Sequence, residues 1–434
     1  MDAKQQPLDR TSADALRAEG LRLGLVDGND RAALAAWDEA DYRGFHDRRP
    51  EPETVDEHVR HTAYRRIVGV WDDGIPESDV PVATVSTWVG DLTVPGGAAL
   101  PSWAVSSVTV APTHRRRGVA RAMLEGELRT AAAAGVPMAS LTVSEATIYE
   151  RYGFGPATQT ADLTIDTRRA GWAHRQASAG RLAFVSLQTI ADTCRDVFER
   201  ARLKTPGEMT LDDFIWGQRA GVLGDRDKKS ASLRAVRYDD EHGVPQGFVV
   251  YSLKADSSDF ANHTVDIRYL RAATDEAYAA LWRFLLELDL VGTVKNEVAT
   301  ADEPVLWMIR DQRAATVVLR DHHWLRILDV KTALEARRYG RPGWLTLRIE
   351  DRLGFASGTY RLDVQADGSA AVEQTDAAPD LSMDVATLSA LYLGAWRTST
   401  LARAGRVTEL TPGAAQRFDA AFRADEAPTL SFWY

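Results

Sequence analysis

The sequence predicts a mixed fold of sheets flanked by helices, α/β in its first two parts and α+β in its last. Three observations predict it. Strand-like and helical segments alternate up to about residue 310, and strand-like segments precede a helical one after about residue 315. At roughly 100–200 residues per domain, the 434 residues suffice for two to four domains. We expect domains at 1–165, 166–310 and 315–434.

In the first part, residues 80–94 are rich in β-branched side chains and stop at the turn signal Pro95-Gly96-Gly97. Residues 103–110 form a second predicted strand. A helix is predicted after it, from apolar residues at helical spacing: Val119, Ala120, Met123, Leu124 and Leu128. Gly135-Val136-Pro137 ends that helix, and residues 138–143 form another strand. Strand, helix and strand in this order predict a parallel βαβ unit.

The second part repeats this rhythm. Residues 247–253 and 264–270 read as strands, and a helix is predicted over 277–290 after the short segment 272–276. The pattern looks like a diverged copy of residues 105–128. It lacks the glycine and the arginines that stand between strand and helix in the first copy, so we interpret it as a duplicated domain without a working ligand loop.

The third part begins with predicted strands at 324–328, 344–349 and 358–364. An amphipathic helix is then predicted from Leu381, Val385, Leu388, Leu391, Tyr392 and Ala395. The chain ends in Leu430-Ser-Phe-Trp-Tyr434, which is unusually apolar. Because chain ends normally fray, this composition predicts that the C-terminus is docked in the fold.

Composition narrows the class of protein. A net charge of −10 argues against a general nucleic-acid binder. The acidic balance suits cationic ligands, although solubility alone explains it more simply. Cys194 is the only cysteine, which excludes an intrachain disulfide and a cysteine-based zinc cluster. No apolar run is long enough to span a membrane, and the N-terminus does not resemble a signal peptide, so a cytoplasmic enzyme is expected.

One motif indicates a ligand-binding site. Arg115-Arg-Arg-Gly118-Val-Ala120 stands between a predicted strand and a predicted helix. A helix N-terminus offers unpaired backbone N–H groups and the positive end of the helix dipole, which suit a diphosphate. Gly118 lets the backbone approach the phosphates, and the arginines add charge-assisted hydrogen bonds. No Gly-Lys-Ser/Thr sequence follows and only one glycine is present, so neither a nucleotide P-loop nor a dinucleotide fingerprint fits.

The R-x-x-G-x-A loop resembles that of the GNAT superfamily of acyltransferases. More specifically, the chain resembles the Eis-type (enhanced intracellular survival) aminoglycoside and lysine N-acetyltransferases of actinobacteria. Residues 92–96, 110–118, 144–158 and 391–401 carry the likeness, and 325–337 adds to it. It implies a GNAT catalytic domain, a second, degenerate GNAT domain, a sterol-carrier-like C-terminal domain, and assembly as a hexamer.

The resemblance also implies the site residues. It makes acetyl-CoA the co-substrate and requires no metal. Acetyl-CoA is expected along Val108, Thr109 and Val110, its diphosphate over Arg116, Arg117, Gly118, Val119, Ala120 and Arg121, and a further contact at Ser144 and Glu145. Tyr149 is the expected general acid. The general base is the free α-carboxylate of the last residue, here Tyr434.

These roles are chemically reasonable. The amine arrives protonated and must lose a proton before it attacks the thioester carbonyl. An α-carboxylate has a pKa of about 3.5 in water, and burial among Phe432, Trp433 and Tyr434 should raise that pKa. A phenol of pKa about 10 can protonate the departing thiolate, and the Val110 N–H could stabilise the developing oxyanion. Two alternatives stay open: Tyr152 could be the acid, and the C-terminus could be docked without catalysis.

The substrate is less defined. A small cationic amine is expected, of the aminoglycoside type first and a lysine side chain second. Residues 37–66 should face it, with Asp38, Glu39 and Asp41 as candidates. Trp433 stands where the family carries an acidic residue. The rivals are a GNAT enzyme for one small amine metabolite and a non-catalytic protein that binds acyl-CoA or lipid. His58 with His61, and His322 with His323, lack the further ligands of a metal site.

Overall fold

The computed structural model describes residues 2–173, 178–223 and 232–434. The chain forms two compact units. The first comprises the residues up to Ala157 together with His323–Ala424 and Tyr434, and the second comprises Thr158–His322 with Asp425–Trp433. In the described ranges, no helix has both the length and the apolar character needed to cross a membrane.

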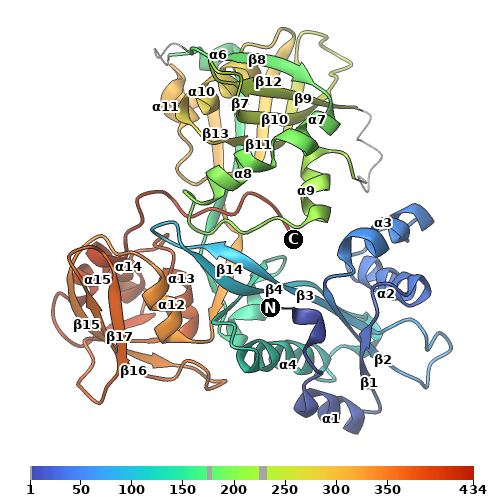
Figure 1. The fold of residues 1–434 in the computed structure, drawn as a ribbon, viewed down its shortest axis with the longest axis vertical. Helices are drawn as coiled ribbons and strands as arrows, with labels where there is room; N and C mark the ends of the chain where they lie inside the picture. The colour runs from blue at the N-terminus through green and yellow to red at the C-terminus, as the bar shows by residue number, and fades with distance from the viewer. Residues whose placement is uncertain (1, 174–177, 224–231) are drawn as a thin grey trace. The chain divides into compact units, whose positions relative to one another are not determined.

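The first unit begins with a seven-stranded sheet in the order β1-β2-β3-β4-β5-β14-β6. Figure 1 labels β1, β2, β3, β4 and β14 of this sheet. Its strands are β1 (Arg22–Val26), β2 (Arg66–Trp71), β3 (Ala83–Thr93), β4 (Ala99–Val110), β5 (Met138–Thr142), β6 (Gly155–Pro156) and β14 (His323–Ile327). Its helices are α1 (Arg10–Ala18), α2 (Arg31–Gly44), α3 (Pro52–Thr62), α4 (Val119–Ala133) and α5 (Ala146–Tyr149). β4 and β5 are parallel and α4 connects them, so the predicted βαβ unit is confirmed.

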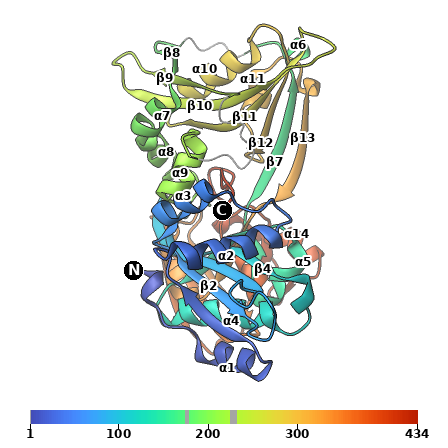
Figure 2. The ribbon, with the colours of Figure 1, turned by 90° about the vertical axis from the view of Figure 1, so that its right-hand side faces the viewer.

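Both faces of this sheet are covered. Val68 and Val70 of β2 belong to a cluster with Met123 and Leu128 of α4. The alternate residues Ile67 and Trp71 pack with Leu34 and Trp37 of α2 on the other face. Figure 2 shows α2 lying across the strands. Strand β14 lies in the expected third domain by sequence, yet it pairs with β5 and β6 here.

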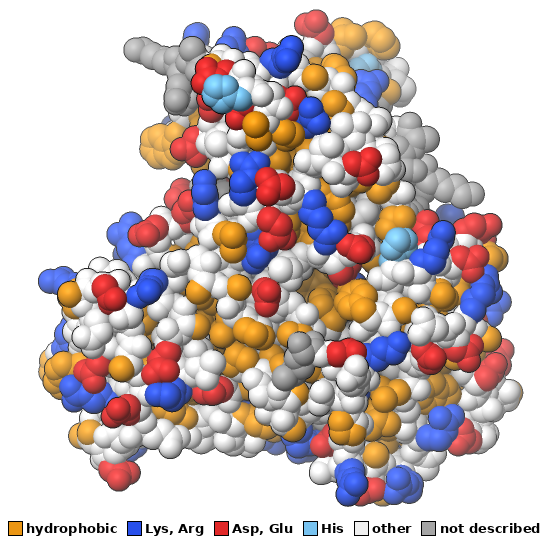
Figure 3. Space-filling view, viewed as in Figure 1, with side chains coloured by type: hydrophobic (Ala, Val, Ile, Leu, Met, Phe, Trp, Pro, Cys, Tyr) orange, Lys and Arg blue, Asp and Glu red, His pale blue; other side chains and the backbone are white. Residues whose placement is uncertain are grey.

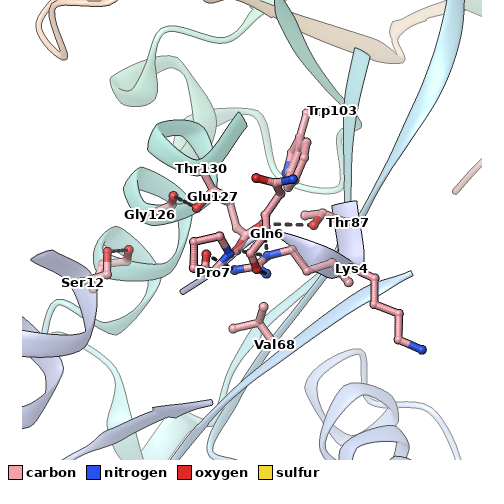
Figure 4. A network of polar contacts seen from close by, with 12 residues as sticks. Lys4, Gln6, Pro7, Ser12, Val68, Thr87, Trp103, Gly126, Glu127 and Thr130 are labelled. Atoms are coloured by element: carbon pink, nitrogen blue, oxygen red, sulfur yellow. Dashed lines mark hydrogen bonds and ion pairs between the residues drawn. The ribbon is translucent and has the colours of Figure 1, made fainter. Parts of the chain in front are cut away.

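A buried ion pair joins the sheet to α4 (Figure 4). Glu127 of α4 accepts hydrogen bonds from Arg66 Nε of β2 at 3.1 Å and from Thr87 Oγ1 of β3 at 2.9 Å. The Trp103 indole also donates to it, at 3.3 Å. Arg66 additionally donates to the carbonyls of Gln6 and Pro7. One carboxylate therefore ties α4 to three strands of the sheet.

Removing this carboxylate should destabilise the fold. Glu127→Ala leaves the Arg66 guanidinium buried without its anion, which typically costs about 3–5 kcal/mol of unfolding free energy. Urea denaturation followed by tryptophan fluorescence measures the loss. Glu125→Ala is the matched control on the same helix, because Glu125 pairs with Arg121 and Arg129, both partly exposed to solvent, and should cost under about 1 kcal/mol. Equal losses in the two variants would contradict the assigned role of Glu127.

A second, five-stranded sheet in the first unit has the order β17-β16-β15-β18-β19. Its strands are β15 (Gly343–Glu350), β16 (Gly358–Val364), β17 (Ala370–Gln374), β18 (Leu381–Asp384) and β19 (Val407–Glu409), with helices α12 (Val330–Ala336), α13 (Val385–Leu391), α14 (Thr398–Arg403) and α15 (Ala414–Phe422). The predicted helix start at Leu381 is wrong. Leu381 pairs with Leu347 in a parallel ladder, and α13 begins only after Asp384, whose carboxylate accepts from the Thr387 N–H as its cap.

The second unit holds another seven-stranded sheet, in the order β13-β7-β12-β11-β10-β9-β8. Its strands are β7 (Gln159–Asp166), β8 (Arg181–Val185), β9 (Leu233–Asp239), β10 (Pro245–Lys254), β11 (His263–Ala272), β12 (Val291–Ala299) and β13 (Ala315–Asp321). Its helices are α6 (Thr167–Ala170), α7 (Leu187–Thr193), α8 (Arg195–Arg202), α9 (Asp213–Ala220), α10 (Asp275–Leu286) and α11 (Val305–Met308). The helix predicted to 290 ends four residues earlier, and Leu290 has a φ of 65°.

The C-terminal segment is docked, as its composition predicts. Leu430 and Phe432 are 0% and 1% exposed. Trp433 departs from the expectation, since 46% of it is exposed.

Charged side chains of both signs are interspersed over the face drawn in Figure 3.

Candidate active site

The site is built where β4 and β5 separate. The two strands pair only from Ser102↔Met138 to Ala104↔Ser140, while β4 continues to Val110. Beyond Ala104 the edge of β4 that faces β5 therefore has no strand beside it. Successive amides of an extended strand point to opposite sides. The Ala111 N–H donates to Val82 on the β3 side at 2.8 Å, so the Val110 N–H points into the opening.

A β-bulge shapes this part of β4. The register of β4 against β3 shifts between the pairs Thr84↔Thr109 and Ser86↔Ser106. Ser107 has a φ of 55°, in the left-handed region. Thr84 holds the bulge: its hydroxyl donates to the Ser107 carbonyl at 2.8 Å, and the Thr109 hydroxyl donates to Thr84 at 2.6 Å. Thr84 is 0% exposed. The bulge directs residues 108–110 toward the opening.

The arginine loop precedes α4. Arg116 and Gly118 have φ values of 65° and 74°, and Gly118 is the N-cap of α4. A Cβ at Gly118 would meet nothing within 4 Å, so the left-handed backbone alone calls for glycine there. No side chain caps the helix, which leaves its first N–H groups to solvent or an anion.

The arginines of this loop have different partners. Arg117 donates to the Glu19 carbonyl at 2.5 Å and lies 3.6 Å from Asp72. The pKa of the Asp72 carboxyl is lowered, chiefly because it accepts a hydrogen bond from His114. Arg115 and Arg116 are exposed and make no ion pair among the described residues. Arg117 therefore fixes the loop, while Arg115 and Arg116 extend from it.

Loss of both exposed arginines should weaken acetyl-CoA binding. If Arg115 and Arg116 contact the cofactor phosphates as we expect, Arg115→Ala/Arg116→Ala should raise the dissociation constant roughly five- to fiftyfold. The difference from wild type should shrink at high salt, because exposed charges are screened. Calorimetric titration with acetyl-CoA at two ionic strengths measures both effects. Arg17→Ala, which breaks an exposed pair with Asp14 on α1, is the control, and an equal loss there would rule out a specific loop contact.

Tyr149 lies just beyond the C-terminal end of β5. It ends α5, is 6% exposed and packs edge-to-face on Phe154 at 6.1 Å. Burial first, and then the charge of Glu145, raises the pKa of its phenol to about 12, although a hydrogen bond with Ser144 acts in the opposite direction. The phenol therefore keeps its proton throughout the neutral range. Ser144 and Glu145 are exposed in the loop between β5 and α5.

A buried arginine supports this segment. Arg326 of β14 donates from Nε to the Tyr152 carbonyl at 2.8 Å, and its Nη2 donates to both carboxylate oxygens of Asp351 at 2.7 Å. A Cβ on Gly153 would lie 2.6 Å from Arg326 Nε, and Gly153 has a φ of 89°. The tight turn after Tyr149 is thus packed directly against a fully buried side chain.

Tyr434 lies against the same end of β5. Its terminal oxygen accepts from the Thr142 hydroxyl at 2.6 Å, and its own N–H donates to that hydroxyl at 3.4 Å. Its phenol donates to Ser140 at 2.9 Å and lies 2.9 Å from His323 Nε2. The ring packs edge-to-face on Trp88 at 5.3 Å. Thr142, which stands two residues before Ser144, therefore orients the C-terminal carboxylate.

The structure brings most expected residues to one edge of the sheet. β4 and β5 are parallel, so residues 108–121, 144–149 and Tyr434 all lie near their carboxyl ends. Two of the three acidic candidates on α2 are already paired, and the third, Asp41, is buried. Asp38 contacts His58 at 2.8 Å and Glu39 contacts Arg49 at 2.6 Å. Asp38 is 1% exposed.

Known proteins share this arrangement. Family models for the acetyltransferase (GNAT) domain match residues 31–157 and 207–327, and one for a sterol carrier protein domain matches 330–431. N-acetyltransferase Eis of Mycobacterium tuberculosis is 37% identical over 353 residues, covering 79% of this chain and 83% of that protein. The chain belongs to the Eis-type N-acetyltransferases. An uncharacterized N-acetyltransferase of Streptomyces avermitilis is also 37% identical, covering 84% of this chain and 87% of its own.

Solved structures agree with the Eis-type assignment. Eis1 from Mycobacterium abscessus superposes with a TM-score of 0.80 at 29% identity, covering 95% of this chain and all of that one. The predicted fold, two GNAT domains followed by a sterol-carrier-like domain, is confirmed. An Eis-type chain is an N-acetyltransferase, and its GNAT fold implies acetyl-CoA as co-substrate. The described residues include no group of three or more His, Cys, Asp or Glu side chains placed to hold a metal ion.

Several side chains of the site escaped the sequence analysis. Thr84, Ser107 and Thr142 carry no local signal, since threonine and serine are ordinary strand and turn residues. Arg326 could have been suspected, because a lone arginine within the apolar strand 324–328 needs a buried partner.

Proposed function

We propose that this Eis-type enzyme transfers acetyl from acetyl-CoA directly to an amine of a small polycation, with the Tyr434 carboxylate as base and Tyr149 as acid. The observation that carries this proposal is the placement of both groups beyond β5. The Thr142 hydroxyl orients the carboxylate at 2.6 Å, and Tyr149 follows Thr142 by seven residues. The single cysteine of the sequence, Cys194, is buried and belongs to the second unit, so it is not offered as a nucleophile.

The residues divide the work as follows. The Val108–Val110 edge and the α4 N-terminus hold the thioester and the diphosphate, with Arg115 and Arg116 adding charge. The Tyr434 carboxylate accepts one proton of the ammonium group and passes it to solvent. The amine nitrogen then bonds to the acetyl carbon and gives its second proton to the same carboxylate, which also releases it to solvent, while the Val110 N–H stabilises the oxyanion. The C–S bond then breaks, and Tyr149 gives its proton to the departing thiolate. Solvent returns a proton to Tyr149.

Aminoglycoside-like polyamines are the proposed substrates, with lysine side chains second. A relative named N-acetyltransferase Eis supports acetyl transfer to amines. The net charge of −10 favours cations at long range. Asp38 and Glu39 would recognise ammonium groups only by exchanging their present partners His58 and Arg49. A homohexamer is part of the same proposal by family likeness.

The test is CoA release from acetyl-CoA with kanamycin and a panel of monoamines and lysine peptides. Release with several polyamines, and little with monoamines, supports the proposed substrate class. A sharp preference for one monoamine would instead identify a single-metabolite enzyme. No release with any amine, with lipid found bound to the purified chain, would overturn catalysis in favour of a binding protein.

A further inference from the structure

The second unit repeats the geometry of the first site without its ligand loop. β11 and β12 are parallel and joined by α10, as β4 and β5 are joined by α4. Their pairing ends at Ile267↔Asn296, while β11 runs on to Ala272. β11 even carries a bulge at the corresponding place, since Val250 and Tyr251 face Tyr269 and Ile267.

The start of α10 is unsuited to phosphate. Thr274 caps the helix by accepting from the Ala277 N–H at 3.2 Å, and the first turn holds Asp275 and Glu276. In α4 the same position is an uncapped glycine beside arginines. Negative charge at a helix N-terminus stabilises the helix but repels an anion. The duplicated opening therefore lacks the features that would hold a cofactor diphosphate.

The chain's own C-terminal segment lies at this place instead. The Tyr269 phenol, two residues past the last β11–β12 pair, lies 3.1 Å from the Ser431 hydroxyl. Thr429 donates to Thr300, the residue after β12, at 3.0 Å. The Thr429 N–H donates to the Pro206 carbonyl at 2.9 Å.

A buried carboxylate completes the attachment. Glu208 is 0% exposed, is paired with Arg271 of β11, and accepts from the Ser431 N–H at 3.1 Å. His322 lies 3.0 Å from the Phe432 carbonyl. Burying a carboxylate is costly unless its hydrogen bonds are satisfied, and one of these is supplied by the tail backbone. Glu208 thus makes a directional hydrogen bond to the backbone of the C-terminal segment at Ser431, in addition to the packing of apolar side chains.

We propose that the second GNAT domain acts as a clamp for the C-terminal segment, with Glu208 and Tyr269 as positioning residues for the terminal carboxylate. The clamp holds residues 429–433 and thereby limits where the next residue, Tyr434, can go. Its purpose rests on the proposed function, in which that carboxylate is the base. The duplicated domain keeps its opening and its bulge because they hold the tail in place of a cofactor.

The test measures how readily the native full-length enzyme loses its last residue to carboxypeptidase. Glu208→Gln removes the negative charge of the group that accepts the hydrogen bond from the Ser431 N–H. Tyr269→Phe with Ser431→Ala removes the hydroxyl pair with little change of volume, in case the first variant folds poorly. Each should release Tyr434 roughly five- to tenfold faster than wild type, as expected for one weakened hydrogen bond. Tyr238→Phe is the control, since its buried phenol donates to Glu276 and makes no hydrogen bond to residues 425–434 among the described residues.

If both clamp variants release Tyr434 at rates within twofold of wild type, the proposal of a clamp is wrong. Turnover and the acetyl-CoA dissociation constant, measured on the same variants, separate the two proposals. Faster release with kcat lowered and acetyl-CoA binding unchanged supports both. Faster release with unchanged kcat keeps the clamp but removes the carboxylate from the catalytic role.

Discussion

Extending the chain by two glycines after Tyr434 should lower kcat about a hundredfold or more. The extension moves the carboxylate by up to about 7 Å and puts a peptide bond where it stood. A peptide carbonyl cannot accept the amine proton, and general base catalysis typically contributes about 10²–10⁴ in rate. The Thr142 hydroxyl would then donate to a neutral carbonyl oxygen. CoA release in the steady state measures the loss.

The pH dependence identifies the cause. Without a base, only amine that has lost its proton in solution can react, so the residual rate should rise about tenfold per pH unit below the amine pKa. A Gly-Gly extension at the N-terminus is the control and should leave kcat unchanged. The acetyl-CoA dissociation constant should stay within about twofold in both. Full activity of the C-terminal extension would exclude Tyr434 as the base and leave an N-acetyltransferase with another one.

How far the sequence could predict this molecule depends on whether a feature is local. The strand 103–110, the helix after it and the loop between them follow from residues within one segment, and all three form as expected. The bulge at Ser107 does not follow, because Thr84, 23 positions away, holds a backbone that serine rarely adopts. The start of α13 was misplaced because Leu381 fits a helical spacing and a strand equally well.

The C-terminus shows the same division. Its apolar composition was enough to predict docking, and Leu430 and Phe432 are buried. Its anchors could not be predicted, because Ser431 meets Glu208 and Tyr269 across 223 and 162 positions of sequence. The surroundings of the terminal carboxylate could also be predicted only in part. The sequence predicts burial of the terminal carboxylate, but not the Thr142 hydroxyl that hydrogen-bonds to it.

Tyr149→Phe should lower kcat by roughly 10²–10³ while leaving acetyl-CoA binding within about twofold, since a missing general acid costs about that much. Because burial raises the pKa of the phenol to about 12, its protonated form persists below about pH 11. Wild type should therefore show no alkaline loss of rate between pH 6 and pH 10, and the variant should keep the same profile at a lower level. Steady-state kinetics across that range measure both.

The leaving group distinguishes an acid from a merely structural tyrosine. A thioester whose thiol is more acidic than CoA needs less help to depart, so the deficit of Tyr149→Phe should shrink with such a donor. A packing defect would lower both rates equally. Tyr152→Phe is the matched control three residues on, and its kcat should stay within about threefold, because its carbonyl and not its phenol is held by Arg326. A larger loss in Tyr152→Phe than in Tyr149→Phe would transfer the acid role to Tyr152.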